Sequence, residues 1–316
     1  MESIAETTLW RRITPELFSS LFSVEGQTLF PSTLRALEKA DTRFREASQA
    51  EYERHLLNYF ALLQREEIIR DTAQNYEAWL RGWTLNLNEI LAAGPSAETC
   101  KPKYFRGSEF LRWRKGLVVT PNPQLEHDLF VVARHQIFNY WLRDYSAVHE
   151  LGCGSCGNLW LLQEIFPDKT IRGYDWVEPS CKIASEIGRH TGRDVAGARL
   201  NFLEPPAKLA IEPNAAVISI HALEQIGDQF GPLLQSILNS KPALVLHYEP
   251  ILDLYDPANV LDALARWYSE KRRYLKGFLP ALHKLRDEGK IEILQEHRPG
   301  LGGILHEMSL IVWRPI

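Results

Sequence analysis

Apolar residues recur at helical spacing through much of the first ninety positions. From about Leu34 to Leu91 they return every third or fourth residue, the stripe that an amphipathic helix buries. Pro31 opens the first such stretch with a start signal, and Gly94 with Pro95 stops the last. The pattern therefore predicts a helical N-terminal third.

The next segment, residues 95 to 123, shows no such period. Its four prolines surround an aromatic and basic stretch, and segments of this kind usually run over the surface of a fold. We expect a connector or lid here rather than core. A further helix is expected over residues 124–142.

Beyond Tyr145, short apolar runs alternate with helical stretches. This alternation is typical of a parallel sheet covered by helices, and it predicts an α/β fold. The expected strands are residues 147–151, 170–174, 198–203, 215–220 and 243–248, and the expected helices are 159–165, 180–191 and 230–238.

The last sixty residues have a different pattern. A long helical region, 257–288, contains Pro280, where we expect a break. Two apolar runs, 290–296 and 308–313, then flank a glycine-rich turn at 299–303. Two strands joined in this way predict an antiparallel hairpin that closes the sheet.

Composition narrows the function classes. The 316 residues carry 36 Lys plus Arg against 40 Asp plus Glu, a formal net charge of −4. Without a long basic run, this balance argues against a nucleic-acid partner. The first twenty residues lack the apolar segment that export needs, and no stretch approaches about 18 apolar residues. With four cysteines that form no disulfide framework, we expect a cytoplasmic protein with free thiols and no membrane partner.

The strand expected at 147–151 runs into a glycine-rich turn. Residues 148–158 read Val-His-Glu-Leu-Gly-Cys-Gly-Ser-Cys-Gly-Asn, and a helix follows, so backbone amides of the turn can face a ligand. The next strand ends at Asp175, 23 residues beyond Gly152, where a carboxylate can accept both ribose hydroxyls.

Other interpretations of this turn stay open. A GxGxxG pattern also fits a nicotinamide or flavin site, or a tight turn without a ligand. Cys153 and Cys156 form a CxxC pair, which suggests metal or redox chemistry. Because no second pair stands at zinc spacing, we expect no metal.

These features resemble the class I S-adenosylmethionine-dependent methyltransferases, over about residues 145 to 316. The resemblance implies a Rossmann-like seven-stranded sheet whose last strand is antiparallel. It also implies S-adenosylmethionine as cofactor, with its methionine end held by Glu150 and the turn glycines. Those glycines are Gly152, Gly154 and Gly157.

The same resemblance assigns residues to the ribose and the adenine of the cofactor. Asp175 would hold the ribose, and Trp176 would lie beside the adenine. At the adenine edge, Asn201 and Phe202 stand where the family usually has an acidic residue followed by an apolar one; an amide oxygen still accepts a hydrogen bond from the adenine amino group. His221, after the fourth strand, completes the cofactor-binding set.

Histidine and glutamate residues follow several of the expected strands, at the edge where ligands of open α/β sheets bind. Methyl transfer needs alignment, exclusion of water and removal of a proton. The alternative roles are strand-end caps, solvated pairs or a helix-start glutamate. Our catalytic candidates are Glu249, His247, Glu307, His306 and Glu224.

The resemblance covers nothing in the first 140 residues. We expect residues 1–143 to form a helical lid and substrate-binding region, and residues 144–316 to form the methyltransferase domain. Arg106 and Arg114 are candidates to pair with a carboxylate of cofactor or substrate, and Trp113 and Tyr248 are further substrate candidates. Surface arginines and a core tryptophan are the alternatives.

The implied activity is methyl transfer to nitrogen or oxygen of a small molecule. Acidic surroundings suit a cationic amine, guanidine or amino acid, because buried carboxylates need a partner charge. One alternative is a cyclase resembling azetidine-2-carboxylate synthases, which releases methylthioadenosine from the same cofactor. Another is a cofactor-binding protein without catalysis. A homodimer through the N-terminal helices is also expected.

Overall fold

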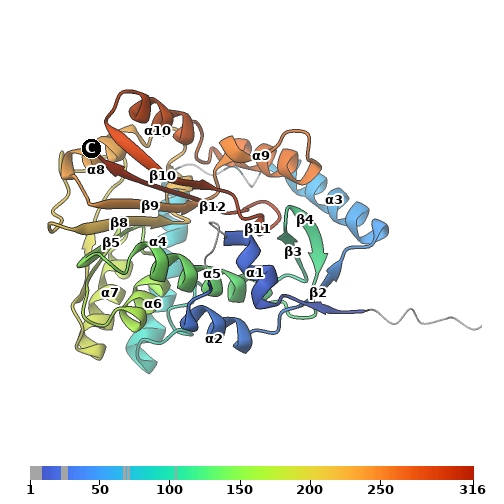
Figure 1. Cartoon of the computed structure of the whole chain (residues 1–316), viewed down its shortest axis with the longest axis horizontal. Coiled ribbons are helices and arrows are strands. Elements are labelled where there is room, and N and C mark those ends of the chain that lie inside the picture. The colour runs from blue at the N-terminus through green and yellow to red at the C-terminus, as the bar shows by residue number, and fades with distance from the viewer. Residues whose placement is uncertain (1–8, 23–27, 67–68, 70–71, 104) are drawn as a thin grey trace, which may run out of the picture.

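The computed structural model describes residues 9–22, 28–66, 69, 72–103 and 105–316 (Figure 1). Its main sheet has seven strands in the order β10-β12-β9-β8-β5-β6-β7. Neighbours from β9 to β7 are parallel, whereas β12 is antiparallel to both β9 and β10. The predicted α/β sheet with an antiparallel last strand is confirmed. The strands are β5 (Ala147–Leu151), β6 (Thr170–Asp175), β7 (Val195–Arg199), β8 (Ala215–Ile220), β9 (Leu244–Glu249), β10 (Ile291–His297) and β12 (Ser309–Pro315).

Helices cover both faces of this sheet. Because successive strand residues point to opposite faces, Ile218 and Leu246 pack with α5, α6 and α7, while Val217 and Val245 pack with α8 and α10. Strands buried on both faces explain the unbroken apolar runs in the sequence. The helices are α5 (Leu125–Trp141), α6 (Gly157–Ile165), α7 (Glu178–Thr191), α8 (Gly231–Ser240) and α10 (Phe278–Asp287).

The break predicted at Pro280 is wrong. Pro280 lies in the first turn of α10, where its missing N–H removes no helical hydrogen bond. The chain breaks earlier, after α9 (Val260–Arg272), where Arg273 and Gly277 have φ of 54° and 76°. A smaller difference occurs at β7, which begins three residues before the predicted strand.

The N-terminal third is largely helical, as predicted. Its helices are α1 (Pro15–Phe22), α2 (Pro31–Lys39), α3 (Gln49–Leu63) and α4 (Thr72–Ala93). The predicted start at Pro31 is confirmed, and α4 ends before Gly94, which has φ of 83°. Residues 67–68 and 70–71 of the predicted stripe lie outside the described residues, as do the first eight residues of the segment judged for export.

A second, smaller sheet replaces much of the expected connector. It has the order β1-β2-β4-β3-β11 and lies beside α3 and α9 at the right of Figure 1. Leu111 and Trp113 are buried, so residues 110–119 belong to the core rather than to a surface loop. Leu301 pairs with Trp113, which joins the end of the chain to the N-terminal region. The strands are β1 (Arg11–Arg12), β2 (Arg43–Glu46), β3 (Phe110–Trp113), β4 (Gly116–Val119) and β11 (Leu301–Gly302).

Two whole-chain observations complete the fold. No described helix has both the length and the apolar character needed to cross a membrane. All four cysteines are buried free thiols, so packing rather than covalent cross-links holds the structure together.

Candidate active site

A cavity of about 1070 Å³ opens at the carboxyl ends of the parallel strands. Residues after β5, β6 and β8 form its floor, and α2, α4 and α5 form the opposite wall. Ligands of open α/β sheets bind at this edge. The volume lies at the upper end of the range for small-molecule sites, which leaves room for two ligands.

The glycine turn shapes one end of this cavity. Gly152 and Gly154 have φ of 78° and 51°, a left-handed conformation that favours glycine. A Cβ on Gly152 would lie 2.3 Å from the Cβ of Ala222, and one on Gly154 would lie 3.0 Å from the Trp83 ring. Gly157 begins α6, so the helix N-terminus faces the cavity.

Two carboxylates flank the turn. Asp175 lines the cavity and accepts hydrogen bonds from the backbone N–H of Gly154 at 2.8 Å and of Val177 at 3.1 Å; burial raises its pKa. Glu150 lies beneath the turn, where Asn158 donates to Oε1 at 2.5 Å and Oε2 has no hydrogen-bond partner. Burial raises the pKa of Glu150 to about 8. A positive group would stabilise this carboxylate.

Aromatic residues line the neighbouring part of the cavity. Trp176, Asn201 and Phe202, which the resemblance assigns to the adenine, all line this part of the cavity. The Trp176 ring contacts Tyr76 and Trp79 of α4, with centroids 5.1 and 6.1 Å away. The Asn201 amide oxygen accepts from the Leu203 N–H at 3.1 Å. This wall suits a flat heteroaromatic group.

Arg134 was not predicted, although it lines the same part of the cavity. Its Nη1 donates to Asn158 Oδ1 at 2.5 Å, and its Nε donates to the Phe130 carbonyl at 3.0 Å. Asn158 thereby links this guanidinium to Glu150. A single arginine in an amphipathic helix carries no distinctive sequence signal, because such residues usually lie at the surface.

Beside the glycine turn, after β8, one carboxylate lies between two imidazoles. Glu224 Oε2 is 3.7 Å from Nδ1 of His221 and 3.8 Å from Nδ1 of His306, and all three residues line the cavity. His221 has φ of 53°, an uncommon conformation for a non-glycine residue that often marks a functional position.

The pKa values of the two imidazoles shift in opposite directions. Burial alone would lower the pKa of His221, but the facing Glu224 brings the net pKa above 6.5. Burial lowers the pKa of His306. For Glu224, burial is outweighed by the two imidazoles, which lower its pKa to about 2. An ionised carboxylate therefore orients one histidine that binds a proton readily and one that stays neutral.

Three of the catalytic candidates, Glu249, His247 and Glu307, do not reach the cavity. Glu249 is wholly buried and accepts three hydrogen bonds of 3.0 to 3.1 Å from the N–H groups of Ala222 and Leu223, so it fixes the turn that carries His221. Burial raises the pKa of Glu249 to about 7. His247 points to the opposite face of β9, where its ring contacts Phe278 and Ser219 lies 2.9 Å from Nδ1. Alternation along the strand separates it from the site.

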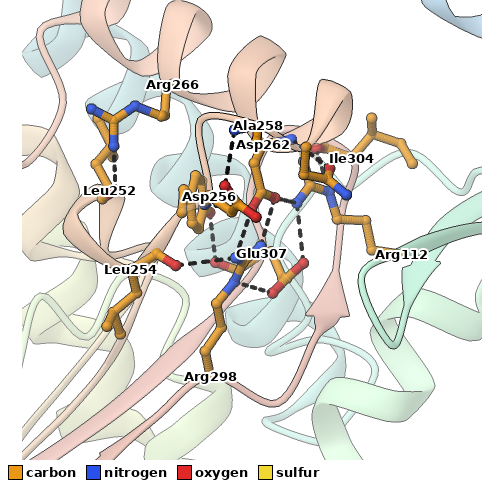
Figure 2. A network of polar contacts seen from close by, with 12 residues as sticks. Arg112, Leu252, Leu254, Asp256, Ala258, Asp262, Arg266, Arg298, Ile304 and Glu307 are labelled. Atoms are coloured by element: carbon orange, nitrogen blue, oxygen red, sulfur yellow. Dashed lines mark hydrogen bonds and ion pairs between the residues drawn. The ribbon is translucent and has the colours of Figure 1, made fainter.

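The side chain of Glu307 also lies outside the cavity, in the buried network shown in Figure 2. Arg112 Nη1 lies 2.5 Å from Asp262 Oδ1 and 3.1 Å from Glu307 Oε2. Arg298 lies 2.6 Å from Asp262 and 2.5 Å from Glu307. The four side chains join β3, α9 and the loop before β12. They hold that loop so that His306, the residue before Glu307, faces the cavity.

Of the substrate candidates, only Tyr248 reaches the cavity, where its hydroxyl has no hydrogen-bond partner. Arg106 is exposed, and Arg114 donates to Ser20 Oγ at 2.5 Å. Trp113 packs in the core against Phe44. These three are displaced because the segment folds into the small sheet. Cavity residues that the sequence did not single out include Glu126, Phe130, Tyr268, Arg272 and Tyr274.

Metal chemistry finds no support in the side-chain arrangement. Across the described parts of the chain, no group of three or more His, Cys, Asp and Glu residues is placed to hold a metal ion.

No protein-family model and no curated protein matches the chain. Solved structures do. An O-methyltransferase of neocarzinostatin biosynthesis, in complex with S-adenosylmethionine and 2-hydroxy-5-methyl naphthoic acid, is 14% identical, with TM-score 0.41 over 62% of this chain and 59% of its own. A geranyl diphosphate C-methyltransferase from Streptomyces coelicolor A3(2) is 10% identical, with TM-score 0.44 over 62% and 85%.

A third similar structure is a sarcosine dimethylglycine methyltransferase, so described provisionally, from Galdieria sulphuraria, 14% identical with TM-score 0.41 over 60% of this chain and 84% of its own. The chain thus spans about three fifths of the neocarzinostatin enzyme. The strand order and the reversed last strand are features of this chain itself. By that arrangement, the chain has the Rossmann-like α/β fold of the class I S-adenosylmethionine-dependent methyltransferases.

Proposed function

We propose that the protein is an S-adenosylmethionine-dependent methyltransferase that acts on a small molecule. The observation that carries this proposal is that one cavity is lined both by the Gly152 turn with Asp175 and by His221 with Glu224. A cofactor site and a proton-accepting group thus share one cavity, which is what methyl transfer requires.

The residues present fit the cofactor. Glu150 is wholly buried beneath the turn rather than in the cavity lining, and its unpartnered Oε2 is the acceptor that the cofactor's ammonium group would approach. Arg134, which does line the cavity, offers a donor for the cofactor's carboxylate. Asp175 would bind the ribose, and the Trp176 and Phe202 rings would enclose the adenine. When bound, S-adenosylmethionine supplies an electrophilic methyl group on a positively charged sulfur, and the carbon–sulfur electron pair stays on sulfur after transfer.

The protein's own part in the reaction is positioning and proton removal. The acceptor nitrogen or oxygen forms the new bond to the methyl carbon, and His221 takes the proton that the acceptor loses. Glu224 stabilises the imidazolium that results. Helices α2, α4 and α5 close the cavity against water. In this proposal residues 1–143 act as the lid and substrate-binding region. The cytoplasmic location and the homodimer stay predictions.

The proposed activity predicts a defined nucleoside product. The purified protein is incubated with S-adenosylmethionine, alone and with a pool of small amines, amino acids and phenols, and the products are identified by mass spectrometry. We expect S-adenosylhomocysteine only with the pool, together with one acceptor that gains a methyl group. Methylthioadenosine without an acceptor would instead identify the cyclase. Binding that raises the melting temperature without any product would identify a non-catalytic binding protein.

Gly152→Ala is expected to weaken S-adenosylmethionine binding at least about tenfold. The left-handed backbone alone costs about 1–2 kcal/mol, and the new Cβ would overlap Ala222, so the turn must move. Gly192→Ala is the matched control, because Gly192 also has positive φ, 67°, but its Cβ would meet nothing within 4 Å. Calorimetric titration measures both. Equal affinities in the two variants would contradict the placement of the cofactor over this turn.

A further inference from the structure

A carboxylate at the cavity has no partner in the protein. Glu126 lies in the first turn of α5, and Gly303 packs so closely that a Cβ there would lie 2.8 Å from Glu126 Oε1. Within the described residues, the Glu126 carboxylate accepts no hydrogen bond and forms no ion pair. Burial raises its pKa to about 6. The fold gains nothing from enclosing such a group, because its desolvation is uncompensated.

The surroundings of Glu126 favour a cation. Ring faces attract positive charge, and this end of the cavity is lined by three rings, those of Phe130, Tyr268 and Tyr274. Phe130 contacts the His221 ring at 5.6 Å, and both tyrosines contact the His306 ring, at 5.2 and 5.8 Å.

Other ionisable groups besides Glu126 also face this space. Arg272 donates to the Tyr274 hydroxyl at 3.0 Å, and the two imidazoles lie next to Glu224. Glu126 is thus the carboxylate without a hydrogen bond or ion pair among the described residues, and its attraction to His221 does not offset its burial. An anionic ligand would be repelled by both glutamates, and a neutral ligand would leave Glu126 uncompensated. A ligand with a positively charged nitrogen satisfies it.

We propose that this end of the cavity binds a small molecule that carries a protonated amine, and that Glu126 is the carboxylate that pairs with the amine. The inference rests on the proposed function only in taking this molecule to be the methyl acceptor. Glu126 is then the specificity-determining residue that distinguishes amines from alcohols of the same shape.

The test measures binding of matched pairs by calorimetry, with S-adenosylhomocysteine present. The probes are phenethylamine with 2-phenylethanol, tyramine with 4-(2-hydroxyethyl)phenol, and putrescine with 1,4-butanediol. In the wild type we expect at least one amine to bind about 30-fold or more tightly than its alcohol. Glu126→Gln should remove that preference. Glu126→Asp should keep part of it, and Glu109→Gln, which removes the same charge from an exposed position, should keep all of it.

Two binding results would overturn the proposal: an amine preference that survives in Glu126→Gln, or a wild type that binds none of the amines more tightly than its alcohol. Thermal unfolding without ligand supplies a second readout. Because Glu126 has no partner, Glu126→Gln should unfold at the wild-type temperature or higher, whereas a clear decrease would show a structural role and would also overturn the proposal. Binding of S-adenosylhomocysteine is measured in a separate titration. If the protein does not bind it, the proposed function fails while the amine preference can still be measured.

Discussion

Substitution of His221 with alanine is expected to lower kcat by about 10²- to 10⁴-fold, the range that general-base catalysis contributes. The imidazole lines the cavity beside Glu224, whose charge raises its affinity for a proton. S-adenosylmethionine affinity should fall less than kcat, because the glycine turn and Asp175 would still hold the cofactor without the imidazole. Single-turnover kinetics and calorimetric titration of the variant measure the two quantities.

The pH profile tests the same assignment. A general base acts in its unprotonated form, so kcat should rise with pH, and the midpoint should lie above 6.5 because Glu224 holds the pKa of His221 above that value. His306→Ala is the control. Burial keeps the pKa of His306 below 6.5, so a midpoint below 6.5 that disappears in His306→Ala would transfer the catalytic role to His306.

Arg112→Met is expected to destabilise the protein by about 3–5 kcal/mol, the cost of removing one partner from a buried ion pair. Arg112 is fully buried and bonds Asp262, Glu307 and the Ile304 carbonyl. After the change, two buried carboxylates share only Arg298. Urea unfolding followed by circular dichroism measures the free energy of unfolding.

A surface arginine supplies the comparison for this prediction. Arg11 pairs with Glu46 at 3.4 Å, and both side chains are largely exposed. Arg11→Met should therefore change the free energy of unfolding by no more than about 1 kcal/mol. Similar values for the two variants would mean that the network of Figure 2 contributes no more than a surface pair.

The sequence predicted the large sheet well because its strands are buried on both faces and stand between helices of ordinary length. β5 and β8 have the predicted bounds. The small sheet was missed because its strands have only two to four residues, and because β3 depends on Leu301 and Gly302, far along the chain. No local sequence pattern indicates that two strands so far apart in the chain will pair.

Site residues could be predicted where they follow one another in the sequence. They could not be predicted where tertiary contacts decide which way a side chain points. The glycine turn, Asp175 and Trp176 follow one another along two adjacent strands, and all reach the cavity. Glu249 was chosen for its place after one strand and Glu307 for its place before the last, but backbone N–H groups hold Glu249 and two arginines hold Glu307 away from the cavity. Glu126 was overlooked because a glutamate in the first turn of a helix is ordinary, stabilised by the helix dipole wherever it points.

The pairing of β11 with β3 also bears on how the chain folds during synthesis. Phe110 to Trp113 are made long before Leu301 and Gly302, so the small sheet stays incomplete until nearly the whole chain has left the ribosome. Contacts of such high sequence separation slow folding, and the exposed edge of β3 can meanwhile pair with other chains. Yield from heterologous expression should therefore depend on chaperones that bind nascent chains, more than the stability of the finished fold would suggest.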